Sequence, residues 1–268
     1  MLHLSALYRY PLKSGKAEAL QQIGLDKLGL DGDRRWMLVD EASGRFLTQR
    51  AVAKMSQLSA LWNSSGGLTL SSPGYAPLHV AMPGSASELR GVTIWRDTLR
   101  VPDAGNEAAA WVSEFIGKPT RLVQLPLERA RTTEAGYGKD DDKVGFADGY
   151  PLLLIGQGSL DDLCEKIGRP MEMLRFRPNL VIEGAEAFAE DGWKRLRIGD
   201  VEFRVVKPCS RCILTTIDPQ TGERSPDREP FATLETYRKT EKGAMFGQNL
   251  VNDGIGRLEV GMPVTVLE

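Results

Sequence analysis

The first hundred residues consist of short apolar runs separated by turn-forming residues, with no long helical period. Leu2, Leu4 and Ala6 alternate with polar neighbours, which is typical of a half-buried strand. The following apolar runs come in pairs joined by four or five residues containing glycine or serine, and such pairs predict β-hairpins. Short strands at this spacing predict a small β-barrel or sandwich. The further strands expected in this part lie at residues 36–39, 45–47, 58–62, 68–70, 77–82 and 92–95.

One helix and one polar segment separate this part from a second set of expected strands. Asn106 is a candidate N-cap for an amphipathic helix that ends before Gly117. Residues 126–148 are polar and contain several glycines, so we expect a flexible, solvated linker there rather than a segment with a chemical role. Ser159 is a candidate cap for a second helix, and Pro230 is the expected start of a third. The strands and apolar runs expected here lie at residues 120–125, 151–155, 180–182, 196–198, 201–206, 212–217 and 264–266.

The length and composition favour a folded protein of two domains. The chain has 268 residues, of which 41% are hydrophobic and 26% charged, and this is long for one domain. We expect a mostly β (α+β) fold with domains at residues 1–120 and 121–268. A formal net charge of −2 argues against a nucleic-acid partner, which would require a basic face. The sequence contains neither an apolar run long enough to cross a membrane nor a secretory signal. With only three cysteines, a disulfide framework is not expected, and we predict a reducing, cytoplasmic location.

Two cysteines spaced three residues apart form the most informative segment. Cys209 and Cys212 lie close to Lys207 and Arg211, and such an electropositive setting favours the thiolate, the form that binds soft metals. A thioredoxin-like pair should open a helix, whereas this pair lies between two expected strands. A structural zinc site needs four ligands, and the chain offers no partners at suitable spacing. Buried cysteines without chemistry remain an alternative, and this is our interpretation of Cys164, on an apolar helix face.

Three further segments could bind an anion, although each alone is also typical of an ordinary exposed turn. Lys13, Ser14 and Gly15 follow the first expected strand and combine a charge, a hydroxyl and a flexible backbone. Arg34 enters a strand, as does the segment Arg-Pro-Asn at residues 177–179. An arginine in such a position can hold a phosphate through its planar guanidinium.

Taken in order, these segments resemble one family over essentially the whole chain. They are Tyr-Pro-Leu-Lys-Ser at residues 10–14, Arg-Pro-Asn at 177–179, Cys-Ser-Arg-Cys-Ile-Leu-Thr-Thr-Ile-Asp-Pro at 209–219, and Met-Phe-Gly-Gln at 245–248. The chain is similar to MOSC proteins that carry a MOSC-type β-barrel domain before the MOSC domain. The mitochondrial amidoxime-reducing component and bacterial hydroxylaminopurine-reducing proteins are members of this family.

The resemblance implies a molybdenum–molybdopterin cofactor, independent of pyridoxal phosphate, with Cys212 as the metal ligand and catalytic residue. It implies no such role for Cys209. At two places the chain departs from relatives: Gly149 and Tyr150 replace a threonine–serine pair, and Asn249 replaces a tyrosine. The positions that the resemblance assigns to cofactor binding are Lys13, Ser14, Arg34, Gly149, Tyr150, Arg177, Asn179, Ser210, Arg211, Cys212 and Asn249.

The resemblance also implies an oxidoreductase that reduces hydroxylamines or amidoximes to amines or amidines. No proton donor can be named, and Asp218 can equally cap a turn. Three cysteines are too few for a plant-type iron–sulfur site, so electrons are expected from a separate flavin reductase, ferredoxin or small cytochrome. We expect a monomer. The alternatives are a non-catalytic cofactor carrier or sulfuration-related module, and a structural protein with incidental cysteines.

Overall fold

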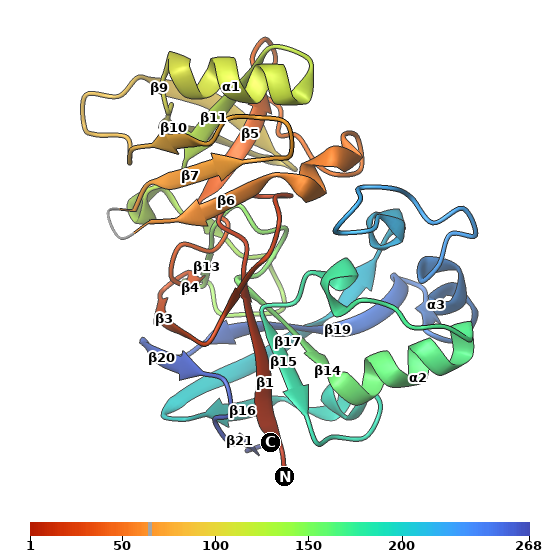
Figure 1. Cartoon of the computed structure of the whole chain (residues 1–268). Helices are drawn as coiled ribbons and strands as arrows, with labels where there is room; N and C mark the ends of the chain where they lie inside the picture. Colours follow the sequence, from red (N-terminus) through yellow and green to blue (C-terminus); the bar gives the residue numbers. More distant parts are fainter. Residues whose placement is uncertain (64–65) are drawn as a thin grey trace.

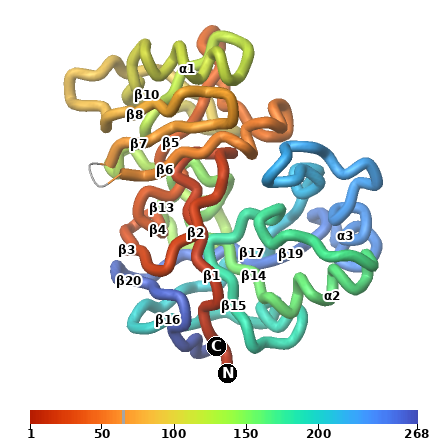
Figure 2. Tube along the Cα trace, viewed as in Figure 1, coloured from red at the N-terminus to blue at the C-terminus, as the bar shows by residue number. Residues whose placement is uncertain are grey.

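The computed structural model describes residues 1–63 and 66–268 and consists of two lobes, with both termini at the foot of one of them (Figure 1). We call this the lower lobe and the other the upper lobe. The chain begins in the lower lobe, crosses to the upper lobe and returns (Figure 2). The strand-rich architecture confirms the expected mostly β fold, in which helices are few.

A nine-stranded sheet forms the lower lobe, in the order β2-β1-β15-β14-β19-β17-β16-β21, with β18 paired to β19. Most neighbours are antiparallel, and β14 and β15 are parallel. A small sheet, β20-β3-β4, completes this lobe. The strands are β1 (His3–Arg9), β2 (Glu18–Leu20), β3 (Gln22–Asp26), β4 (Gly29–Leu30), β14 (Leu152–Gly156), β15 (Leu180–Glu183), β16 (Arg195–Ile198), β17 (Val201–Arg211), β18 (Lys239–Thr240), β19 (Gly243–Asn252), β20 (Gly256–Glu259) and β21 (Val264–Val266).

Small antiparallel sheets build the upper lobe around a core that includes Trp36, Leu38 and Phe115. The expected hairpin of residues 58–62 and 68–70 is confirmed by the pairing of β6 with β7, although Ser64 and Ser65 of its loop lie outside the described residues. The other expected hairpin does not form as two paired strands, because Trp36–Asp40 pair with Thr120–Gln124. Residues 45–47 contact β5 through a single bridge, between Val39 and Phe46. The strands are β5 (Trp36–Asp40), β6 (Ser59–Trp62), β7 (Leu68–Ser71), β8 (Leu78–Val80), β9 (Leu89–Ile94), β10 (Asp97–Pro102) and β11 (Thr120–Gln124).

Three α-helices lie at the expected places, but their N-caps differ from the prediction. Asn106 is the first helical residue rather than the cap, and its side chain instead accepts a hydrogen bond from Arg121. Ser159 lies inside its helix, where its hydroxyl donates to the buried carboxylate of Glu190. The helices are α1 (Asn106–Ile116), α2 (Gln157–Ile167) and α3 (Phe231–Tyr237), and the short 3-10 helices are η1 (Ala53–Gln57), η2 (Leu127–Arg129), η3 (Met173–Phe176), η4 (Ala189–Gly192) and η5 (Ile213–Thr216).

The segment 212–217 is not the strand that its β-branched residues predict. The strand β17 ends at Arg211, and η5 follows it. The hydroxyl of Thr215 donates to the carbonyl of Cys212 (3.0 Å), and that of Thr216 donates to the carbonyl of Ile213 (2.8 Å). These local bonds offer the backbone an alternative to a sheet ladder, so the prediction from residue type was wrong.

The polar segment 126–148 is more firmly attached than a solvated linker. It includes two short paired strands, β12 (Arg131–Thr132) and β13 (Lys143–Val144). The guanidinium of Arg131 is buried and donates to the carbonyl of Gly145. Asp142 forms a two-pronged ion pair with Arg204 of β17, at 2.6 and 2.9 Å. The segment therefore packs against the lower lobe and is not the flexible, solvated linker that its composition predicts.

The first strands of the chain lie in the lower lobe, beside strands from the second half of the sequence. Strand β1 pairs with β15, and β3 pairs with β20. The turn after β1 therefore lies between the lobes, beside segments from the second half of the chain.

Candidate cofactor site

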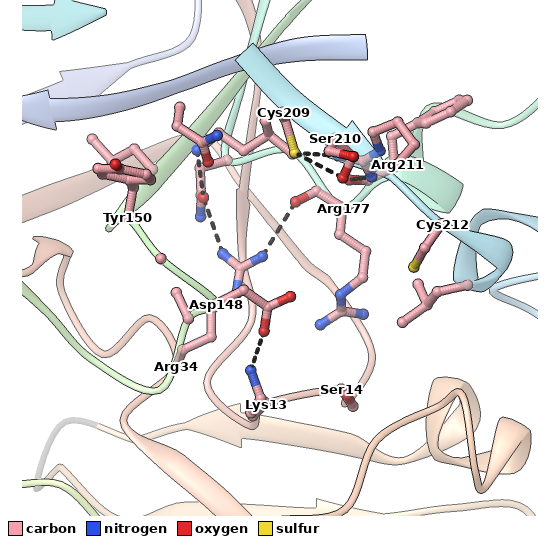
Figure 3. A pocket seen from close by; sticks show the side chains of 18 of the residues that line it. Lys13, Ser14, Arg34, Asp148, Tyr150, Arg177, Cys209, Ser210, Arg211 and Cys212 are labelled. Atoms are coloured by element: carbon pink, nitrogen blue, oxygen red, sulfur yellow. Dashed lines mark hydrogen bonds and ion pairs between the residues drawn. The ribbon is translucent and has the colours of Figure 1, made fainter. Parts of the chain in front are cut away.

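A cavity of about 150 Å³ lies where the two lobes meet. Every position predicted to bind the cofactor lines it. Figure 3 shows Lys13, Ser14 and Arg34 on one side of the cavity and the segment Cys209 to Cys212 on the other. The cavity opens into a wide groove that shares Arg50, Asp148, Tyr150 and Cys209 with it. The predicted residues in its wall are Lys13, Ser14, Arg34, Gly149, Tyr150, Arg177, Asn179, Ser210, Arg211, Cys212 and Asn249.

Lys13 and Ser14 belong to the turn after β1. The Lys13 amide donates to the carbonyl of Trp36, which ties the turn to β5, and Ser14 has a positive φ of 62°. The Lys13 ammonium is buried and donates to the carbonyl of Phe146 (2.8 Å) and to Oδ1 of Asp148 (2.5 Å). Burial lowers the pKa of Lys13, with the charge of Asp148 opposing the shift. One buried cation is thus fixed at the wall of the cavity.

Asp148 was not predicted as a site residue, because it falls in the segment expected to be a linker. The Asp148 side chain is 70% exposed, because it faces the open cavity. Burial raises the pKa of Asp148, but the charge and hydrogen bond of Lys13 outweigh this effect and hold it below its usual value. Asp148 is therefore ionised at neutral pH.

Arg34 is held by neighbours that leave its charge only partly balanced. Its Nη1 donates to Oδ2 of Asp33 (2.7 Å) and to Oδ1 of Asn179 (3.0 Å), and its Nη2 donates to the carbonyl of Arg177. Asn179 also donates to the carbonyl of Tyr8 and accepts from the amide of Leu153. The amide of Asn179 is thus committed mainly to the protein, so this residue positions Arg34.

Arg177 has a buried donor atom without a partner. It ends η3 in the left-handed conformation, with φ of 57°, and its Nη1 donates to the carbonyl of Gly15 (2.7 Å). Its Nη2 is buried and has no hydrogen-bond partner. Burial lowers the pKa of Arg177 to about 10. A buried guanidinium with a free donor is costly unless an anion satisfies it, and this is the first sign that the cavity is built for an anion.

The cysteine segment crosses the far wall of the cavity. Pairing of β17 with β19 continues to Arg211, opposite Ala244, and Cys212 is the N-cap of η5. Arg211 donates to the sulfur of Cys209 (2.9 Å) and to the carbonyl of Phe176 (2.6 Å), while its Nε is buried without a partner. The rigid strand pair and the 3-10 turn together fix the place of the Cys212 sulfur.

Arg50 is a second site residue that the sequence did not reveal. Its Nη1 lies 4.0 Å from Sγ of Cys212, a long contact from the upper lobe. Its carbonyl accepts a hydrogen bond from Arg224, close to η5. Arg50 is 162 residues from Cys212 in sequence and carries no local motif, so only the fold brings them together.

The remaining predicted residues line the cavity, but their polar contacts are to other protein groups. The Ser210 hydroxyl donates to the carbonyl of Lys242 (3.0 Å), and Nδ2 of Asn249 donates to the carbonyl of Lys207 (3.1 Å). The Tyr150 hydroxyl donates to the carbonyl of Glu134 at 3.4 Å, and burial raises the pKa of Tyr150. Gly149 has open space, since an added Cβ would meet only Glu134, at 3.8 Å. These residues form part of the cavity wall but contribute no charge to it.

The charges of the cavity fit an anionic molecule that itself supplies most of the atoms coordinating a metal. Among the described residues, its wall contains one carboxylate, that of Asp148, and five cations: Lys13, Arg34, Arg50, Arg177 and Arg211. Within the same residues, no group of three or more histidine, cysteine or acidic side chains could hold a metal ion. Cys212 could thus supply one soft ligand to a metal whose other ligands belong to a bound molecule. A phosphate- and dithiolene-bearing pterin has this character, so the residues fit it.

Comparison with known proteins identifies the class of protein that has this fold and site. The MOSC N-terminal beta barrel domain family matches residues 1–119, and the MOSC domain family matches residues 141–265. The chain is therefore a MOSC-domain protein.

Within this class the chain belongs to the family that includes the amidoxime-reducing components. It is 32% identical to human mitochondrial amidoxime-reducing component 1, over 98% of this chain and 82% of that protein. It is equally identical to component 1 of Danio rerio, over 97% of this chain and 83% of that protein. Component 2 of Rattus norvegicus is 33% identical, over 97% and 82% of the two chains. In the described part of this chain, no helix is long and apolar enough to span a membrane.

Proposed function

We propose that this protein binds a molybdenum–molybdopterin cofactor through Cys212 and reduces N-hydroxylated compounds. The observation that carries the proposal is the convergence of five cations on a cavity whose wall includes the Cys212 sulfur. The similarity to amidoxime-reducing components supports a reductive role on amidoximes.

Each lobe would hold a different part of the cofactor. Lys13, Ser14 and Arg34 would bind its phosphate end, since charge-assisted hydrogen bonds to phosphate are among the stronger polar contacts, at about 1.5–3 kcal/mol each. Arg177 offers a free donor, and Arg211 carries a further charge beside the cysteines. Cys212 would bind the metal, while Asn179 would keep Arg34 aligned. Arg50 would place a positive charge beside the ligand sulfur.

The overall reaction adds two electrons and two protons to the N-hydroxyl group, breaks the N–O bond and releases water. When bound, the cofactor supplies the two-electron chemistry. The chain supplies the site: Asp148 is ionised and open to the cavity, so it can accept a hydrogen bond from a substrate N–H but cannot act as an acid at neutral pH.

Asp218 does not provide the missing proton donor either. Its Oδ1 accepts from the amides of Gln220 and Thr221, and its Oδ2 pairs with Arg175 at 2.8 Å. Burial raises the pKa of Asp218, but these turn amides and Arg175 outweigh it and lower the pKa. Asp218 caps a turn, and we propose that water in the open groove delivers the protons.

Electrons would come from a separate redox protein, and the three free cysteines support a reducing, cytoplasmic location. The test is reduction of a hydroxylamine and an amidoxime by metal-loaded protein with an artificial electron donor. Turnover by wild type that is lost in Cys212→Ser supports the proposal. Retained cofactor without turnover, together with its transfer to a cofactor-free enzyme, would show a carrier instead.

A further inference from the structure

Trp95 occupies a backbone position that normally requires glycine. The register of β9 and β10 pairs Ile94 with Asp97 and leaves a two-residue loop, Trp95 and Arg96. Trp95 has a φ of 53°, and Arg96 is not among the residues with positive φ. A positive φ at the first loop residue is the pattern of a type II′ turn, in which glycine is preferred at this place. The sequence predicted a strand as far as Trp95, and the strand ends one residue earlier.

The hydrophobic effect does not explain why a tryptophan is kept in this conformation. A bulky residue with positive φ is strained, and such strain is concentrated at functional sites. Trp95 is 41% exposed, so much of the possible gain from burial is absent. The exposed part of the Trp95 ring faces the groove, so a role in binding a molecule there would explain the residue.

The ring of Trp95 stands where the groove meets the inner cavity. It packs on Phe46, with centroids 4.9 Å apart and planes tilted by 59°, and the guanidinium carbon of Arg50 lies 4.8 Å from its centre. Its Nε1 donates to Asp148 (3.3 Å). Arg50 and Asp148 line both groove and cavity, and Arg50 reaches the Cys212 sulfur. A molecule moving toward Cys212 through the groove would therefore pass the exposed part of this ring.

We infer that Trp95 is a substrate-stacking residue that selects planar, conjugated N-hydroxylated compounds over saturated ones. This inference rests on the proposed function. The indole offers a large π surface, and Phe46 beside it extends the aromatic wall. A flat substrate on that wall would have its N–H groups within reach of the ionised Asp148. A saturated ring of similar size keeps the volume of such a substrate but loses the stacking.

The test uses two amidoximes that differ only in their ring, benzamidoxime and cyclohexanecarboxamidoxime. Dissociation constants are measured by calorimetry on the metal-loaded protein without an electron donor, and turnover is measured separately with an artificial donor. The variants are Trp95→Leu, Trp95→Phe and Trp95→Gly. Trp111→Phe is the control, because Trp111 packs on Tyr75 and Phe115 and lines neither cavity nor groove.

Trp95→Leu should weaken benzamidoxime binding about tenfold, the size expected for a stacked aromatic pair, and change cyclohexanecarboxamidoxime binding less than twofold. Trp95→Phe should keep most of the preference. Trp95→Gly should lose it while melting above Trp95→Leu, since glycine tolerates the positive φ. The changes in ring preference distinguish a substrate contact from a purely structural tryptophan, and the melting temperature of Trp95→Gly reports only the strain of the positive φ.

Equal weakening of both compounds in Trp95→Leu would overturn the inference. So would a Trp95→Phe variant as impaired as Trp95→Leu, because the ring would then act only through its Nε1 bond to Asp148. Failure of the proposed function looks different: metal-loaded wild type would then reduce neither compound. Turnover of both compounds with an unchanged preference in Trp95→Leu would refute the stacking role alone.

Discussion

Replacing Arg177 by methionine tests whether the cavity is built for an anion. The variant keeps an unbranched apolar side chain at this position but removes the charge and the unpartnered Nη2. We expect Arg177→Met to lose cofactor while keeping nearly the stability of the wild-type protein in the cofactor-free state. If Arg177 instead stabilised the fold, its replacement would lower the free energy of unfolding and leave cofactor binding unchanged.

The magnitude follows from opposing contributions. Burial lowers the pKa of Arg177 from 12.5 to about 10, and at about 1.4 kcal/mol per pKa unit the folded state disfavours the charge by roughly 3 kcal/mol. Against this, the bond to the Gly15 carbonyl contributes about 1.5–3 kcal/mol. The sum is near zero, so the free energy of unfolding should change by about 1 kcal/mol or less.

The assay is urea unfolding of cofactor-free protein, followed by measurement of cofactor affinity. Loss of one charge-assisted bond of about 1.5–3 kcal/mol should weaken cofactor binding by roughly 10- to 150-fold. Arg204→Met is the matched control, since Arg204 is fully paired with Asp142 and Asp253. It should cost about 3–5 kcal/mol, because the carboxylate of Asp142 is buried and loses its ion-pair partner. A comparable loss of stability in Arg177→Met, with unchanged cofactor affinity, would refute the reasoning.

Two further variants test the network around the cavity. Asp148→Asn should lower the free energy of unfolding by about 1 kcal/mol at pH 7, a small value because the carboxylate is open to water. The folded-state pKa of Asp148 lies below 3.8, so the stabilisation is present above that pH and is lost as the pH falls through the folded-state pKa. Acid unfolding curves of wild type and Asp148→Asn should therefore converge at low pH. A difference between the two proteins that grows below pH 4 would contradict the ion pair. Asn179→Ala should cost about 2 kcal/mol in urea unfolding, because it leaves the carbonyl of Tyr8 and the amide of Leu153 without their partner. An unchanged midpoint would show that these two bonds do not stabilise the fold.

The sequence predicted those parts of the fold and site that depend on local pattern. Hairpins such as β6–β7 follow from paired apolar runs around turn residues. The cofactor positions were predicted by resemblance, and the structure brings all of them to one cavity. Whether they bind the cofactor stays a prediction.

The features that the sequence did not reveal depend on contacts between distant segments. Pairing of β1 with β15 places the Lys13 turn beside Arg177, and no local pattern indicates this register. Asp148 and Arg50 acquire their roles only through Lys13 and Cys212, more than a hundred residues away. The 3-10 turn after Cys212 was missed because threonine favours strands on average, whereas here both hydroxyls bond back to the preceding carbonyls.

The most direct test of the account is the molybdenum and pterin content of protein made in a host that produces the cofactor. Wild type, Cys212→Ser and Cys209→Ser should be compared by metal mass spectrometry and by fluorescence of the oxidised pterin. The account predicts about one molybdenum per chain in wild type and in Cys209→Ser, and loss of metal in a folded Cys212→Ser variant. Well-folded wild type without molybdenum, or equal loss in both variants, would contradict it.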